Sequence, residues 1–144
     1  FIEFAAKKLS WQNLAFEDAP YITSTDNLIE FCRCTMGYCE VEVLRLIYVD
    51  AKLKVIETEV LQKGSVSSVN INPRDIVANA LKKNASGVIM VHNHPTGDPR
   101  PSNNDIEATK RVKIACEAVG VTLHEHLIIT PSDFYSFAHH HLIV

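Results

Sequence analysis

The chain has 144 residues, of which 47% are hydrophobic and 22% are charged, and its formal net charge is −3. This length and apolar content fit one compact domain with a hydrophobic core of its own. The acidic balance argues against a domain built mainly to cover a nucleic-acid backbone, and the apolar runs at 46–49 and 87–91 are far shorter than the roughly 20 residues of a transmembrane helix.

The first part of the chain predicts helices. The residues after Phe1 lack the charged-then-apolar pattern of a signal peptide. We therefore expect residues 1–39 to be a helical segment that packs on the core and forms the end of the upstream region of a longer protein. Residues 2–12 are predicted to form one helix, and residues 24–26 offer a cap for a second. Residues 40–144 are predicted to form the main domain.

Three of the four cysteines fall in the segment CRCTMGYC at residues 32–39. A domain of this size with an ordinary core does not need disulfides, so we expect reduced thiols and a cytoplasmic location. The C-x-C spacing in this segment differs from the C-x2–4-C pairs of common structural zinc sites, and no zinc site is expected there.

A hairpin is predicted next. Residues 40–50, EVEVLRLIYVD, first alternate and then become continuously apolar, which is typical of a strand that enters the middle of a sheet. Residues 53–62 follow a short polar turn and provide the second strand. Residues 65–71 predict a third strand with a weaker pattern.

A helix is predicted over residues 72–84, because Asn72 can cap it and Pro73 fits its first position. Its side chains at helical spacing predict an apolar stripe that faces the core. That stripe consists of Ile76, Val77, Ala80 and Leu81.

The last part of the chain continues this alternation. Residues 87–92 predict a strand buried on both faces, and residues 121–130 predict a last strand before an aromatic segment at 133–138. Between the two strands, Ser102 begins a helix that Gly120 ends. Its apolar positions at helical spacing are Ala108, Val112, Ala115 and Val119. Interleaved helices and strands with one hairpin predict the α/β class, with a mixed sheet flanked by helices.

Two histidines stand at the end of the strand at 87–92, in the segment HNHPTGDPRPSNND. His92 and His94 are two residues apart, so their imidazoles point the same way, and two neutral nitrogens favour zinc or a similar metal. Such a pair alone is more often a packing or surface feature. Asn93 alternates to the opposite face, which argues against a nuclease reading of the letters HNH.

The loop after the histidines adds an acid. Prolines stiffen the loop, Gly97 permits a sharp turn, and Asp105 falls in the first turn of the helix that Ser102 begins. Taken alone, Ser102 and Asp105 are also explained by helix capping and by the helix dipole.

The whole pattern, H-x-H-P-x6-S-x2-D at residues 92–105, resembles the JAMM motif, the zinc-metallopeptidase signature of the JAB/MPN superfamily. Residues 72–112 resemble bacterial RadC proteins, which are named as DNA repair proteins, and the resemblance covers about residues 40–143. It implies a JAB/MPN-like, that is cytidine-deaminase-like, architecture for residues 40–144. It also implies a zinc-dependent hydrolase of peptide or isopeptide bonds.

The same resemblance implies the site residues. His92, His94 and Asp105 would be the three protein ligands of a catalytic Zn2+ ion, with a fourth position left for water. Ser102 would cap its helix and also steady the water or a developing oxyanion, with capping alone as the alternative.

A base is also needed, and spacing alone does not choose it. The resemblance selects Glu42, and Glu40 is the alternative, because a slip of two residues keeps the same strand face. The glutamates that spacing leaves open are Glu40, Glu42, Glu57, Glu59 and Glu125.

A second H-x-H lies in the last predicted strand. His126 is expected either to support the site side of the sheet or to be a buried, hydrogen-bonded histidine. Residues 139–141, three histidines near the chain end, are assigned no function.

Other functions are also compatible with this sequence. The chain could be a DNA-associated module whose DNA affinity comes from an N-terminal region outside it, since zinc can activate water against phosphate too. It could also be a catalytically silent scaffold. We expect a peptide or protein as the substrate and no association with a membrane. The sequence does not identify the particular substrate or the oligomeric state.

Overall fold

The computed structural model describes residue 22 and residues 24–36, 39–64 and 70–143. The helix predicted over 2–12 and most of the strand predicted over 65–71 lie outside these residues, while Asn70 and Ile71 are described and are not in a strand. Within the described part of the chain, no helix has the length and apolar character that crossing a bilayer requires. The helices there are α2 (Thr25–Met36), α3 (Pro73–Lys82) and α4 (Asn103–Ala118).

Among the described residues, five strands form one mixed sheet in the order β2-β1-β3-β4-β5. β3 pairs in parallel with β4, whereas the β1–β2, β1–β3 and β4–β5 pairs are antiparallel. The predicted α/β class with a mixed sheet is therefore confirmed. The strands are β1 (Val43–Val49), β2 (Val55–Lys63), β3 (Gly87–Asn93), β4 (Thr122–Ile129) and β5 (Phe134–Ser136).

The predicted hairpin is formed by β1 and β2. One carboxylate oxygen of Asp50 accepts hydrogen bonds from the backbone N–H groups of Lys52 and Lys54, at 2.8 and 2.9 Å. Leu53 takes a positive φ of 64° in the same turn. The Asp50 side chain thus replaces backbone partners that the tight turn removes.

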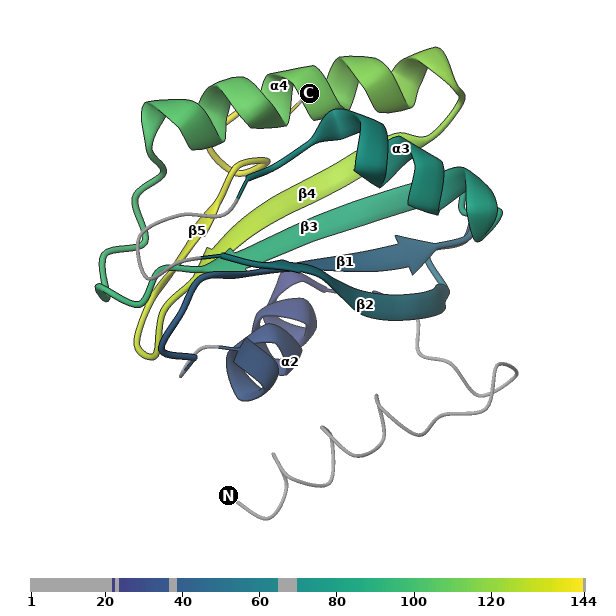
Figure 1. The fold of residues 1–144 in the computed structure, drawn as a ribbon. Helices are drawn as coiled ribbons and strands as arrows, with labels where there is room; N and C mark the ends of the chain where they lie inside the picture. Colours follow the sequence, from purple (N-terminus) through teal and green to yellow (C-terminus); the bar gives the residue numbers. More distant parts are fainter. Residues whose placement is uncertain (1–21, 23, 37–38, 65–69, 144) are drawn as a thin grey trace.

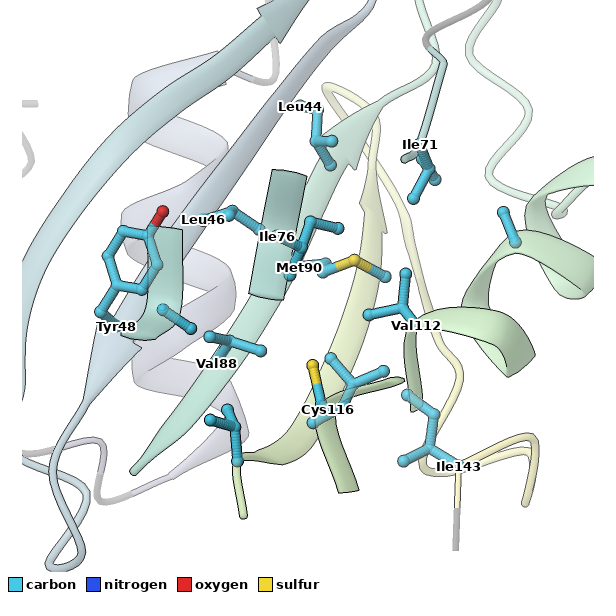
Figure 2. Packing of buried hydrophobic residues seen from close by; sticks show 14 of the residues in the cluster. Leu44, Leu46, Tyr48, Ile71, Ile76, Val88, Met90, Val112, Cys116 and Ile143 are labelled. Atoms are coloured by element: carbon cyan, nitrogen blue, oxygen red, sulfur yellow. The ribbon is translucent and has the colours of Figure 1, made fainter. Parts of the chain in front are cut away.

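Helices cover both faces of the sheet, with α3 and α4 on one face and α2 on the other (Figure 1). On the α3/α4 face, side chains such as Leu46, Met90 and Val112 form one buried cluster, which Figure 2 shows from close by. On the opposite face, Leu28 and Phe31 of α2 join a second cluster with strand residues. β3 lies between these clusters, and all of its residues are buried, as predicted.

The helices begin and end close to the predicted residues, but some side chains of the predicted apolar stripes are exposed. In α3 the side chain of Ile76 is buried, but Leu81 is 53% exposed, because five residues of helix turn it about 140° away from the direction of Ile76. In α4 Val112 is buried, but Val119, the C-cap residue, is 42% exposed. Gly120 has the expected positive φ, 78°.

Candidate metal centre

The end of β3 brings two imidazole rings together on the α3/α4 face. His92 is fully buried and His94 is partly buried, and their Nε2 atoms lie 3.0 Å apart. The backbone N–H of His94 donates to the carbonyl of Ile129 at 3.1 Å, which ties the end of β3 to the end of β4. The ring of His94 is held from its other side, where Nδ1 lies 2.9 Å from the Asp98 carbonyl oxygen.

Asp105 reaches the two rings from the first turn of α4. Ser102 is the N-cap residue, and its hydroxyl accepts the N–H of Asp105 at 3.0 Å while Oδ2 of Asp105 accepts the N–H of Ser102 at 2.9 Å. The predicted capping box is therefore present. Because the box fixes the carboxylate, Oδ2 lies 3.7 Å from Nε2 of His92 and 3.5 Å from Nε2 of His94.

These three donor atoms suit a tetrahedral zinc ion. Within the described residues, His92, His94 and Asp105 form a group of possible metal ligands whose donor atoms all lie within 4.8 Å of one another. Bonds of about 2.0–2.1 Å at tetrahedral angles require donors about 3.3 Å apart. The separations of 3.0, 3.5 and 3.7 Å bracket that value. Two neutral nitrogens and one carboxylate oxygen are also ligands that zinc accepts.

The electrostatics of the three residues also favour a cation. Burial would raise the pKa of Asp105, but the nearby His92 and His94 rings hold it well below its usual value. Burial would lower the pKa of His94, but its contacts with the Asp105 carboxylate and the Asp98 carbonyl raise it. Both shifts express the same requirement for positive charge between the rings and the carboxylate.

Glu42 lies beside this group, directly before β1. Its side chain is largely buried, and its Oε1 lies 3.8 Å from Nε2 of His94. Glu40 is exposed. Of the two residues that the sequence resemblance left for the base, Glu42 is thus the one beside the rings.

The other glutamates that spacing left open have partners elsewhere. Glu57 and Glu59 of β2 pair with Lys83 after α3. Glu125 of β4 accepts hydrogen bonds from the Ser136 hydroxyl at 2.7 Å and from the Ala138 N–H at 3.0 Å. These contacts hold the C-terminal segment against β4 and do not reach the rings.

Asn93 lies between the two histidines in the sequence, and its side chain forms hydrogen bonds on the opposite face of the sheet. It is 1% exposed; its Oδ1 accepts the N–H of Val43 at 2.7 Å, and its amide donates to the carbonyls of Val41 at 3.0 Å and Cys39 at 3.4 Å. These three bonds fasten the segment that contains Glu42 to the strand that contains the histidines. The prediction that Asn93 does not share the histidines' face is confirmed.

We expect Asn93→Ala to lower the free energy of unfolding by about 2–3 kcal/mol, because it removes the partners of the buried N–H of Val43 and of the partly buried carbonyl of Val41. Asn104→Ala, which alters an exposed asparagine in the first turn of α4, is the matched control and should change stability by less than about 0.5 kcal/mol. Urea unfolding of the two variants measures both values. Equal stabilities would contradict the fastening role.

Two residues stand behind His92 in the interior. His126 of β4 is fully buried, its Nε2 lies 2.7 Å from Nδ1 of His92, and its Nδ1 lies 2.7 Å from the hydroxyl of Thr109 in α4. Burial, and then the proximity of the His92 ring, lower the pKa of His126 well below its usual value. The sequence indicated that His126 either supports the site or is a buried, hydrogen-bonded histidine; the structure confirms that it is buried and hydrogen-bonded, and its partner is His92.

Thr109 was not singled out from the sequence. The signal that could have found it is its spacing, since it lies four residues after Asp105 and therefore on the same side of α4.

Comparisons with known proteins show which sequences resemble this chain. A family model described as RadC-like JAB domain matches residues 22–142. A UPF0758 protein of Ruegeria pomeroyi is 47% identical over 116 residues, which are 81% of this chain and 52% of that protein. A UPF0758 protein of Rhodobacter capsulatus is 37% identical over 136 residues, or 94% of this chain and 63% of the relative.

A third relative is also a UPF0758 protein. A UPF0758 protein of Thermotoga maritima is 41% identical over 116 residues, which are 81% of this chain and 52% of that protein. The chain thus spans from about half to less than two thirds of the length of these curated relatives.

Proposed function

Because the chain belongs to the RadC-like JAB domain family, we propose that it is a zinc-dependent hydrolase of peptide or isopeptide bonds. The observation that carries the proposal is the convergence of Nε2 of His92, Nε2 of His94 and Oδ2 of Asp105, which are 3.0–3.7 Å apart, with the Glu42 carboxylate next to them. Three protein ligands are the number found in catalytic zinc sites, which keep a further position open.

In this proposal the side chains divide the work. A bound zinc ion supplies Lewis acidity, which lowers the pKa of water and polarises a carbonyl group. Glu42 accepts the proton of the attacking water and passes it to the departing amine, as a general base and then a general acid. Its position at 3.8 Å from Nε2 of His94 supports this role.

Ser102 has the smaller part in this proposal. Its hydroxyl oxygen already accepts the N–H of Asp105 in the capping box, so it holds the carboxylate in place. The hydroxyl proton remains available in chemical terms, because a serine hydroxyl can donate one hydrogen bond and also accept. We propose that it donates to the oxyanion that develops on the substrate.

Metal removal tests the function as a whole. We expect protein purified without chelators to contain about one zinc ion per chain and to cleave members of a panel of fluorogenic peptides and lysine-linked isopeptides. Treatment with 1,10-phenanthroline should abolish cleavage, and zinc should restore it. A zinc content near zero would refute the metal site, whereas full zinc without any cleavage would favour the silent scaffold. A DNA affinity that falls steeply as the salt concentration rises would favour the DNA-associated alternative.

A further inference from the structure

We propose that His126 and Thr109 are positioning residues that keep the Nδ1 proton of His92 in place, so that Nε2 of His92 always presents its lone pair to the metal. The proposal rests on the zinc site proposed above, and it adds residues that bind neither metal nor substrate. The three side chains and the backbone of Asp105 form a continuous hydrogen-bonded chain through the interior between β3, β4 and α4.

The direction of every hydrogen bond in this chain follows from its last acceptor. The Thr109 hydroxyl lies 2.7 Å from the backbone carbonyl oxygen of Asp105. A carbonyl oxygen can only accept, and a hydroxyl has one proton. The hydroxyl therefore donates to the carbonyl of Asp105, and only its lone pairs remain for Nδ1 of His126, which lies 2.7 Å away.

The two histidines then have defined tautomers. Nδ1 of His126 must be the donor to Thr109, and burial disfavours the doubly protonated ring, so Nε2 of His126 is an acceptor. Nδ1 of His92, at 2.7 Å from that acceptor, must be protonated in turn. In the neutral ring of His92 the nitrogen with the free lone pair is therefore Nε2, the atom that faces His94 and Asp105.

His94 is also protonated at Nδ1, because of a single hydrogen bond to the backbone. Its Nδ1 lies 2.9 Å from the backbone carbonyl oxygen of Asp98, which again can only accept. With both Nδ1 atoms protonated, the two Nε2 atoms, which lie 3.0 Å apart beside the Asp105 carboxylate, are the ring positions left to hold either a metal ion or a proton. Three unprotonated donor atoms at these distances would repel one another, so the site favours a cation, and the hydrogen bonds behind the ligands direct both Nε2 atoms toward it.

The ring of His126 is held in its plane by packing as well. Phe137 stacks on it with ring centroids 4.3 Å apart and an interplanar angle of 13°, and Phe137 is fully buried. Asp105 supplies a candidate ligand oxygen, and its backbone carbonyl is the last acceptor of the hydrogen bonds that lead to His92. The first turn of α4 therefore positions both Asp105 and His92.

Variants of Thr109 test the proposal with little change in shape. Thr109→Val removes the hydroxyl and keeps the branched side chain, whereas Thr109→Ser keeps the hydroxyl. We expect Thr109→Val to weaken Zn2+ affinity by about tenfold to hundredfold, the loss typical of removing the hydrogen-bond partner of a metal ligand, and Thr109→Ser to restore most of it. Thr122→Val, at the exposed far end of β4, is the matched control and should bind Zn2+ like the wild type. Competition with a chromophoric chelator gives the affinities.

The tautomers provide a readout that is independent of zinc. Long-range 1H–15N spectra of the metal-free wild-type chain should show His126 and His92 protonated at Nδ1, and Thr109→Val should lose the single tautomer of His126. A wild-type His126 protonated at Nε2 would overturn the proposal, even if Thr109→Val failed to fold. Equal zinc affinity for Thr109→Val and Thr122→Val would overturn it too. The expected tautomers in a chain that binds no zinc would instead refute the proposed metal site and leave the hydrogen-bonded chain supported.

Discussion

His92→Ala and Asp105→Asn chains are expected to purify with almost no zinc and to show no hydrolysis above background. Each change removes one of three protein donors from a group that converges within 4.8 Å. We expect the zinc affinity to fall by more than about 100-fold, beyond the tenfold to hundredfold loss typical of residues that only support a ligand. Metal content after dialysis, measured by plasma mass spectrometry, and chelator competition give the two values.

The choice of asparagine at position 105 separates metal binding from folding. Asp105 also accepts the N–H of Ser102 in the capping box, and an asparagine side chain can still accept that hydrogen bond through its amide oxygen. His124→Ala is the control, because His124 is an exposed histidine of β4 outside the ligand group. Stoichiometric zinc in the His92→Ala or Asp105→Asn chain, at wild-type affinity, would mean that the metal binds elsewhere.

The features that sequence predicts well here are those with a simple period. Alternation along a strand is enough to place His92 and His94 on one face and Asn93 on the other, and the structure agrees. The capping box is equally local, since Ser102 and Asp105 are three residues apart. Local patterns of this kind led to the α/β class and to most element ends.

The features that sequence misses depend on contacts between distant elements. Thr109 lies 17 residues from His126, and nothing in the local pattern pairs them. The alternation of a strand cannot choose between Glu40 and Glu42, because both fall on the same face. The side chain of Asn93 forms hydrogen bonds with Val43, the first residue of β1 and 50 residues away, and with Val41 before that strand. These bonds hold the start of β1 close enough for Glu42 to lie beside His94.

Glu42→Gln is expected to retain zinc and to lose hydrolysis. Glutamine has nearly the same shape as glutamate, but its amide does not accept a proton at neutral pH, so the step that requires a base loses its acceptor. General base catalysis contributes about 10²–10⁴-fold, and we expect kcat to fall by about that factor on the best peptide of the panel. Zinc affinity should change little, because the carboxylate of Glu42 lies outside the ligand group.

Glu40→Gln is the matched control, because it makes the same chemical change two residues away on an exposed side chain. It should leave kcat within about twofold of the wild-type value, since a surface substitution away from the site alters little. If Glu40→Gln were inactive and Glu42→Gln active, the base would be Glu40, and the 3.8 Å approach of Glu42 to His94 would be a structural contact only. Loss of zinc from Glu42→Gln would instead make Glu42 a metal ligand, because proton transfer alone does not require it for metal binding.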